Sequence, residues 1–283
     1  MKKARLTFLG TGTSQGVPMI GCGCNVCISR DSRDKRLRAS VLVEYDGMTI
    51  LVDAGPDFRQ QMLTNGIRHV DAILLTHNHK DHTGGLDDIR AFNYIEKRAT
   101  EIYCEEYVEK SLRQEYAYAF AEKKYPGAPE WHLNRIDDKP FTIRYGGPHE
   151  VLSWTHDHGY TRHIEGEDEV IRSTEIIPIR GMHYKLPVLG FRFGNIAYCT
   201  DMNHIAEEEF QKLTGLDHFV INCVKYGKHI SHFSLEEAIE VAKKVGAGHT
   251  WLTHLSHQLP CYTELSKELP DTILPAYDGL VIE

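Results

Sequence analysis

The amino-acid sequence predicts an α/β domain in which two β-sheets pack together and helices cover their outer faces. Three observations support this fold class. A strand-rich half is followed by helices, and a second strand-rich half is again followed by helices. The composition, 41% hydrophobic and 25% charged, is that of a globular protein. The length of 283 residues is enough to bury a large core, so we expect one domain over residues 1–283.

The first half of the chain consists mainly of short apolar segments that predict strands. A short helix is expected over residues 57–65, from Asp57 to the Asn65-Gly66 pair, and a charged helix over 105–124. The expected strands cover residues 4–9, 39–45, 48–53 and 71–76, the second and third joined as a hairpin through Asp46-Gly47.

The second half begins with a segment of different character. Residues 126–168 are rich in Pro, Gly, Asp and His and predict a loop or insertion. Ser234 is expected to cap a helix over 234–245, with Glu237 completing a capping box. The other expected elements are strands near 169–179, 187–193 and 195–200, a helix over 205–214, and a last strand pair at 250–254 and 279–282.

Charge and composition limit the possible partners. The net charge of −8 and the lack of a basic arm argue against tight binding to a long nucleic acid. No apolar run approaches the roughly 18 residues that span a bilayer, so no membrane partner is expected. Seven cysteines without an export signal indicate a cytoplasmic protein with free thiols rather than a disulfide framework. The 17 histidines direct attention to metal binding.

Four potential metal ligands fall within six residues after an apolar strand: His77, His79, Asp81 and His82. His77 and His79 share a side in extended backbone, whereas Asp81 and His82 lie beyond the bend. One loop can therefore serve two metal ions a few ångströms apart.

This segment resembles the HxHxDH signature of the metallo-β-lactamase superfamily. The resemblance implies a four-layer αββα sandwich of two mixed β-sheets with helices outside. It also implies further ligands at the ends of later strands: His183 on the first metal, Asp201 as a bridging carboxylate and His254 on the second metal. Asp53, which ends the segment ILVDAG, matches the acidic residue that orients a ligand in this family.

A second cluster has the pattern CxCxxC, with Cys22, Cys24 and Cys27 close enough to wrap one tetrahedral zinc ion. His257 follows His254 by three residues and can complete a Cys3His site. Such a site is structural because it leaves no open position for water. Together with the opening LGTGTSxGxP loop and the ending Ala276-Tyr277-Asp278-Gly279, this cluster resembles the phosphoribosyl 1,2-cyclic phosphate phosphodiesterase branch of the superfamily.

Two further histidines lie shortly before the helix over 234–245. In the resembling phosphodiesterases, and in the related tRNA-processing endonucleases, a histidine at this place protonates the leaving oxygen or holds the phosphate. His232 matches that position best, and His229 is the rival. The sequence His156-Asp157-His158 lacks a preceding apolar strand, and we interpret it as part of a rim.

These features predict a metal-dependent hydrolase, most simply a phosphodiesterase that acts on a small cyclic phosphate. Two divalent ions, zinc or manganese, would supply hydroxide and draw charge from the phosphoryl oxygen, and one structural zinc would occupy the cysteine site. Asp81, His232 and His229 are the residues expected to act in catalysis besides the metal ligands. The expected partner is a small anionic phosphodiester, with a homodimer left open.

Three alternatives remain at this stage. The chain could be a tRNA 3′-processing endonuclease, against which its charge argues. It could also be a hydrolase of another bond, such as a thioesterase or lactamase, which does not predict the cysteine cluster. A non-enzymatic metal-binding scaffold is the third, and the full ligand set argues against it.

Overall fold

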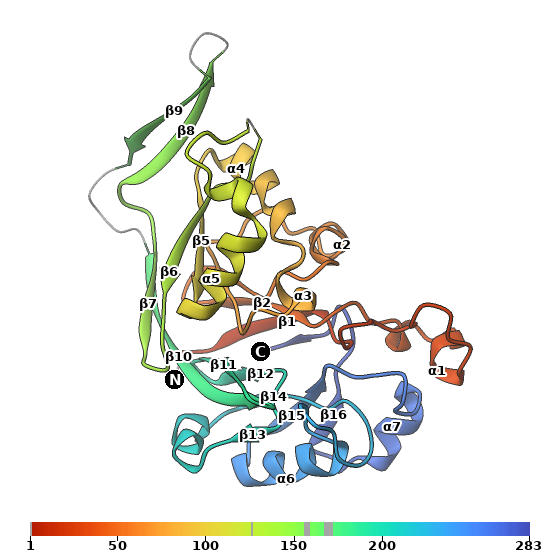
Figure 1. Ribbon diagram of the computed structural model, residues 1–283. Coiled ribbons are helices and arrows are strands. Elements are labelled where there is room, and N and C mark those ends of the chain that lie inside the picture. Colours follow the sequence, from red (N-terminus) through yellow and green to blue (C-terminus); the bar gives the residue numbers. More distant parts are fainter. Residues whose placement is uncertain (1, 126, 156–158, 167–171) are drawn as a thin grey trace.

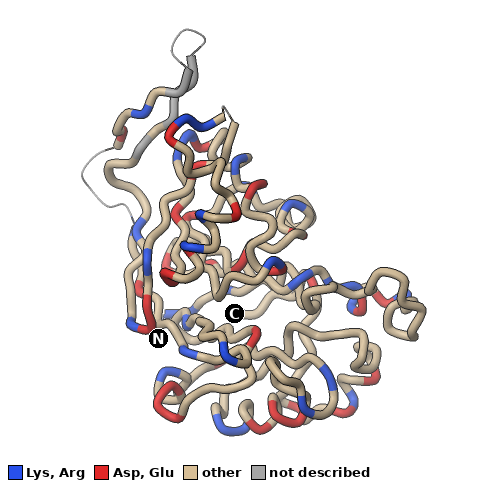
Figure 2. Tube along the Cα trace, in the orientation of Figure 1, with Lys and Arg blue, Asp and Glu red and all other residues tan. Residues whose placement is uncertain are grey.

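Figure 1 shows the computed structural model, which describes residues 2–125, 127–155, 159–166 and 172–283. Two large sheets pack face to face, and helices lie on the outer face of each sheet. The predicted four-layer sandwich is therefore confirmed. Basic and acidic residues are interspersed along the described parts of the chain, as Figure 2 shows.

The first sheet has seven strands in the order β17-β1-β2-β3-β4-β5-β6. Its first three contacts, from β17 to β3, are antiparallel, and its last three, from β3 to β6, are parallel. The strands are β1 (Ala4–Gly10), β2 (Ser40–Tyr45), β3 (Met48–Val52), β4 (Ala72–Leu74), β5 (Thr100–Cys104), β6 (Trp131–Arg135) and β17 (Val281–Ile282).

The second sheet has the order β13-β10-β11-β12-β14-β15-β16, and β7 pairs with the other end of the long strand β10. A separate hairpin of β8 and β9 projects from the body of the molecule (Figure 1). The strands are β7 (Phe141–Tyr145), β8 (His149–Thr155), β9 (Gly159–Glu165), β10 (Arg172–His183), β11 (Leu186–Phe193), β12 (Ile196–Cys199), β13 (His204–Ile205), β14 (His218–Asn222), β15 (His249–Thr253) and β16 (Ile273–Pro275).

The two sheets repeat one pattern of strand pairing. From β1 to β6, two antiparallel contacts are followed by three parallel ones, and the same sequence of contacts runs from β10 through β11, β12, β14 and β15 to β16. Asp53, directly after β3, therefore has its counterpart in Asp201, which follows β12 in the other sheet. Because the parallel strands of a sheet end at the same edge, this arrangement gathers polar residues at one end of the sandwich.

Three apolar cores hold the layers together. The core between the sheets includes Phe8, Ile50, Phe191 and Tyr198, all fully buried. The other two lie between each sheet and its helices. The helices are α1 (Asn25–Ile28), α2 (Phe58–Thr64), α3 (Lys80–Thr83), α4 (Arg90–Glu96), α5 (Glu106–Glu115), α6 (Leu235–Val245) and α7 (Tyr262–Glu268), and the short 3₁₀ helices are η1 (Ser32–Asp34), η2 (Leu86–Ile89), η3 (Ala117–Phe120) and η4 (Glu207–Leu213).

Four sequence predictions need correction. The segment 126–168, expected to be a loop, contains the strands β6, β7, β8 and β9. These strands were not predicted because turn residues are frequent in the segment, and because the strands bury only one face or lie outside the two sheets. The strands expected near 250–254 and 279–282 both form, but they do not pair with each other: β15 lies in the second sheet and β17 pairs with β1 in the first. The helix expected over 205–214 is the 3₁₀ helix η4.

The helix expected over 105–124 is also shorter than predicted, because α5 ends at Glu115 and η3 follows it. By contrast, Ser234 caps α6 and forms the predicted capping box with Glu237. Among the described helices, none has the length and apolar character required to cross a membrane. The histidines of His156-Asp157-His158 lie outside the described residues.

Candidate metal centre

The candidate ligands of the first cluster come from segments that leave the ends of strands. His77 and His79 lie between β4 and α3, and Asp81 and His82 belong to α3. The other three follow or end strands of the second sheet: His183 is the last residue of β10, Asp201 lies two residues after β12, and His254 directly follows β15.

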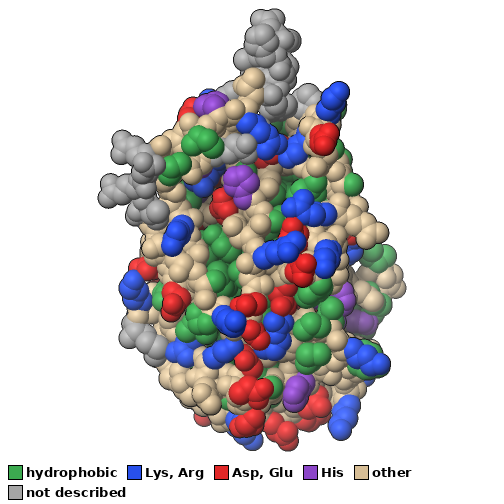
Figure 3. Space-filling view, turned by 60° about the vertical axis from the view of Figure 1, so that its left-hand side comes forward, with side chains coloured by type: hydrophobic (Ala, Val, Ile, Leu, Met, Phe, Trp, Pro, Cys, Tyr) green, Lys and Arg blue, Asp and Glu red, His purple; other side chains and the backbone are tan. Residues whose placement is uncertain are grey.

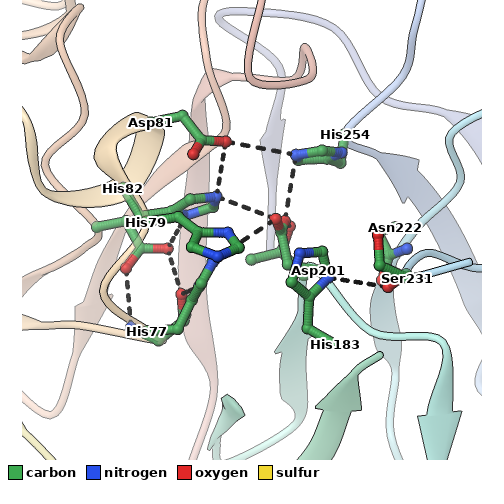
Figure 4. Close-up of polar contacts among 12 residues, drawn as sticks. His77, His79, Asp81, His82, His183, Asp201, Asn222, Ser231 and His254 are labelled. Carbon is green, nitrogen blue, oxygen red and sulfur yellow. Dashed lines mark hydrogen bonds and ion pairs between the residues drawn. The ribbon is translucent and has the colours of Figure 1, made fainter. Parts of the chain in front are cut away.

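The structure brings these seven residues into two adjoining groups of potential ligands. His77, His79 and His183 form one group, and Asp81, His82, Asp201 and His254 form the other; within each group the donor atoms lie within 4.8 Å of one another. Figure 4 shows that the side chains converge on a common space between the two sheets.

Asp201 lies where the two groups meet. Its Oδ2 is 3.2 Å from His82 Nε2 and 3.8 Å from His77 Nε2, and its Oδ1 is 3.3 Å from His254 Nε2 (Figure 4). One carboxylate therefore reaches histidines of both groups, which is the geometry required of a bridging ligand.

The donor set fits divalent cations. Donors bound tetrahedrally at about 2.0–2.3 Å from an ion lie roughly 3.3–3.8 Å apart, close to the separations around Asp201. His77 Nε2 and His254 Nε2 are buried and have no hydrogen-bond partner among the described residues. Buried nitrogens without partners are costly, and a cation would satisfy them.

The backbone at three of these strand ends adopts an uncommon conformation. Asp53, Asp201 and His254 have φ values of 63°, 57° and 55°, in the left-handed region that non-glycine residues seldom occupy. Each of the three turns sharply away from the end of its strand. Such strain persists where the surrounding structure fixes it and is common at functional sites.

Electrostatics within the cluster favour cations. Burial, followed by the nearby His82, lowers the pKa of His77 well below its usual value and leaves a neutral ligand. Burial acts against charge on His82 as well, but Asp201 and Asp81 outweigh it and raise the pKa of His82. A proton on His82 thus offsets carboxylate charge, and metal binding would displace that proton.

Residues outside the ligand set hold the ligands in place. Asp53 Oδ2 accepts a hydrogen bond from His82 Nδ1 at 2.6 Å, and both Asp53 oxygens accept from Thr76. Thr76 Oγ1 is also 2.9 Å from His77 Nδ1. On the other side, His183 Nδ1 donates to the carbonyl oxygen of Ser231 at 2.8 Å (Figure 4).

Sequence reasoning found Asp53 but missed three of these supporting residues. Thr76 could have been noticed because it directly precedes His77. Asn222 ends β14 and forms two hydrogen bonds with the Met202 backbone, 2.8 and 2.9 Å long, which fix the turn after Asp201. Ser231 acts through its backbone, so its residue type carries no signal.

The two candidate catalytic histidines occupy different environments. The His232 ring lies 4.5 Å from that of His183 and 4.6 Å from that of His254, centre to centre. Burial, and then the neighbouring His254, lower the pKa of His232 to about 3. The ring of His229 lies 5.1 Å from that of His232, centre to centre, and His229 is half-buried. The structure thus brings His232, rather than His229, against the metal ligands.

The predicted cysteine site also assembles. The donor atoms of Cys22, Cys24, Cys27 and His257 lie within 4.8 Å of one another, and His257 Nδ1 is 3.4 Å from Cys22 Sγ and 3.5 Å from Cys24 Sγ. A tetrahedral zinc ion bound by sulfur and nitrogen places such atoms about 3.5 Å apart. The backbone N–H of Cys27, and then His257, lower the pKa of Cys24 to about 6, which favours the thiolate. All seven cysteines are free of disulfides.

Comparison with known families assigns this arrangement to a class of proteins. Residues 48–255 match the β-lactamase superfamily domain, a stretch that includes all seven ligands of the two groups. The chain therefore belongs to the metallo-β-lactamase superfamily of hydrolases. The resemblance predicted from the sequence is confirmed.

Individual relatives refine this assignment. A crystal structure of a new diphosphatase from the PhnP family is 36% identical and has a TM-score of 0.81, with coverage of 99% of this chain and 98% of that one. Zinc-bound PqqB from Methylobacterium extorquens has a TM-score of 0.67 at 19% identity, covers 99% of both chains and supports the fold alone. An octanoyltransferase of Porphyromonas gingivalis is 39% identical over 98% of this chain. This chain spans about half of that relative, 51% of its length.

Proposed function

We propose that the protein is a metal-dependent phosphodiesterase that acts on a small phosphorylated substrate, a cyclic sugar phosphate being the first candidate. The observation that carries the proposal is the position of Asp201, whose carboxylate lies near His82 and His254 of one ligand group and near His77 of the other. The PhnP-family diphosphatase, similar over nearly the whole chain, supports phosphorus chemistry.

Two bound divalent ions, zinc or manganese, would supply Lewis acidity and lower the pKa of water towards neutrality. His77, His79 and His183 would hold one ion, and Asp81, His82 and His254 the other, with Asp201 shared. Asp53 keeps the Nε2 atom of His82 free for a ligand bond, because its carboxylate accepts the proton of Nδ1. His232 lies beside both groups and would donate a hydrogen bond to the departing oxygen. It would donate a proton once the negative charge of a bound phosphate has raised its low pKa.

A small substrate fits the charge distribution better than a long nucleic acid. Phosphate recognition along a nucleic acid requires a stripe of Lys and Arg, whereas the basic residues of this chain alternate with acidic ones (Figure 2). We infer that the tRNA-processing alternative is the weaker one. The free cysteines support our expectation of a reducing, cytoplasmic environment.

The experiment that tests the proposal is a substrate panel with metal-loaded protein. It compares phosphoribosyl 1,2-cyclic phosphate, 2′,3′-cyclic nucleotides, bis-p-nitrophenyl phosphate, a diphosphate diester and a tRNA precursor. We expect the highest kcat/KM on a small cyclic or linear phosphodiester. Turnover of the tRNA precursor alone would refute the proposal.

A second candidate, hydrolysis of an acyl thioester, rests on the octanoyltransferase relative. That name applies to a protein about twice as long, so the activity can reside in the half that this chain does not match. Octanoyl thioesters therefore belong in the panel. Faster turnover of an octanoyl thioester than of every phosphodiester would favour this candidate.

A further inference from the structure

A large cavity lies away from the candidate metal centre, between the edge strand β6 and the strand β7. Its volume is about 850 Å³, within the range of roughly 300–1,000 Å³ that is typical of small-molecule sites. None of the candidate ligands of either metal site lines it. Pro148, His149 and Ile164, from the start of the β8–β9 hairpin and from its second strand, form part of its wall.

The cavity carries positive charge in a protein whose net charge is −8. Among the residues that the structure describes, Arg98, Arg135 and Arg144 line it against a single acidic residue, Glu101. Arg135 pairs with Glu109. Neither Arg98 nor Arg144 forms a close ion pair with a carboxylate among the residues that the structure describes, although the charge of Arg98 acts on Glu101 at longer range, and Arg144 is exposed. Two unpaired guanidinium groups in one cavity are suited to phosphate oxygens, which they can bind in a bidentate manner.

The acidic residue of the cavity argues against a simple inorganic anion. Glu101 Oε1 is 3.0 Å from His132 Nδ1, and Oε2 accepts from Asn134 at 2.7 Å. Burial disfavours the carboxylate, but the hydrogen bonds with His132 and Asn134, together with the charges of His132 and Arg98, outweigh burial and lower the pKa of Glu101, which favours its ionised form. An ionised carboxylate repels phosphate and accepts hydrogen bonds from hydroxyl groups, as acidic residues do from ribose in nucleotide sites.

Planar side chains also lie in and beside the cavity. Phe141 lines the cavity and stacks on Tyr103 at a centroid distance of 5.5 Å. Arg98 lies over the ring of Tyr145, 4.5 Å from its centre, so its guanidinium plane is held in place. Figure 3 brings this side of the molecule forward and shows basic, histidine, acidic and hydrophobic side chains gathered on its upper part. Aromatic and guanidinium planes stack readily with nucleobases.

We propose that this cavity is a second binding site, separate from the metal centre, for a nucleoside diphosphate. Arg98 and Arg144 take the phosphates, Glu101 accepts hydrogen bonds from the ribose hydroxyls, and Phe141 packs against the base. The backbone bridge between Arg98 and Val151 fixes the β8–β9 hairpin beside the cavity.

The test is calorimetric titration of the metal-loaded protein with ADP, inorganic pyrophosphate and adenosine. ADP should bind more tightly than either fragment. Arg144→Gln should weaken ADP binding about tenfold or more, the value of a charge-assisted hydrogen bond. Arg59→Gln, which removes an exposed arginine on α2, is the matched control and should change nothing.

Glu101→Gln separates a nucleotide site from a plain anion site. It should weaken the binding of ADP and strengthen that of pyrophosphate, because a repelling charge and a ribose acceptor are removed together. Tighter binding of pyrophosphate than of ADP to the unaltered protein would overturn the proposal. So would tighter binding of a single-stranded oligonucleotide, which would indicate an RNA surface.

Binding at the metal centre must be distinguished from binding in the cavity. Asp201→Asn, which alters the metal centre, should leave the affinity for ADP within twofold if the cavity is the site. If Asp201→Asn abolishes ADP binding and Arg144→Gln does not, the nucleotide binds at the metals and the proposal is wrong.

Discussion

Asp53 Oδ2 and His82 Nδ1 lie 2.6 Å apart, both fully buried, and this contact fixes which nitrogen of His82 faces the metal centre. Asp53→Asn keeps the shape of the side chain and tolerates the positive φ, but its amide can donate to Nδ1 and move the proton to Nε2. We expect a loss of about 10–100-fold in metal affinity, the usual effect of removing such a partner. Titration against a competing chelator measures it.

The control for this variant is Asp271→Ala, which removes an exposed carboxylate that belongs to neither group of potential ligands. It should leave metal affinity unchanged. If Asp53→Asn also binds metal as the unaltered protein does, Asp53 only fills space behind the site.

Asp201 should matter for both metal ions, because its oxygens face both ligand groups. Asp201→Asn should lose most of the active-site metal and all measurable turnover, whereas Asp81→Ala should reduce the content by one ion. Elemental analysis gives the metal content, and circular dichroism checks that the fold is retained. Asparagine is preferred over alanine here because it tolerates the left-handed backbone of residue 201. Equal metal loss in both variants would contradict a bridging role.

The cysteine site should act on stability rather than on turnover. Cys24→Ser should lose one zinc ion, and a destabilisation of about 3 kcal/mol would lower Tm by roughly 6–12 °C. Cys261→Ser is the matched control, since Cys261 packs beside this cluster but is outside the four donors. If Cys24→Ser keeps its full metal content and its Tm, the cluster is a thiol-bearing loop.

Features that depend on residues close together in the sequence were predicted better than features that depend on contacts between distant segments. Local signals identified most strands of the antiparallel hairpins, the capping box at Ser234, the ligands of the loop from His77 to His82 and the cysteine cluster. The ligands His183, Asp201 and His254 were predicted only through the family resemblance. Strand partners depend on distant contacts, which is why β15 and β17 were paired wrongly. The strand β14 was not predicted. It has only five residues, and it is held in the sheet by parallel pairing with β12 and β15 rather than by a neighbouring hairpin strand, so no local turn signal marks it.

The same distinction holds at the site. The clustered residue types around His77 indicate metal binding, whereas the backbone carbonyl of Ser231 that accepts from His183 leaves no signal in the sequence. The cavity beside β6 was invisible for another reason. Its walls come from five strands within and beside a segment expected to be a loop, and only folding places Arg98 near Arg144.

A pH dependence of stability is expected from His69, which is outside both metal sites. Asp71 and then Glu96, each 2.8 Å away, raise the pKa of His69 to about 9. Arg172 also contacts Asp71 and competes for its charge. Since the folded-state pKa exceeds the reference value of 6.5, the protonated histidine stabilises the fold fully below about pH 6.5, and this contribution is lost as the pH rises through about 9.

His69→Gln should therefore lower the free energy of unfolding by about 1 kcal/mol at pH 6, a value reduced for partial exposure, and have little effect at pH 10. Urea unfolding at the two pH values measures the difference. His204→Gln, which alters an exposed histidine of β13, should show no such pH dependence. A loss from His69→Gln of the same size at both pH values would mean that packing, rather than charge, is responsible.

The last prediction concerns His232, whose ring lies against those of His183 and His254. If His232 protonates the departing oxygen, its effect depends on how basic that oxygen is, and general acid help is typically worth about 10²–10⁴-fold. A ribose hydroxyl needs the proton, while p-nitrophenolate leaves without it. His232→Ala should therefore slow a cyclic ribose phosphate far more than bis-p-nitrophenyl phosphate, with both active-site metals retained. Equal losses on the two substrates would show that His232 binds phosphate or shapes its loop.

Loss of a metal ion from the variant would instead make His232 a ligand, as its position beside His183 and Asp201 also allows. No loss on either substrate would transfer the role to His229, and His229→Ala should then show the dependence on the leaving group.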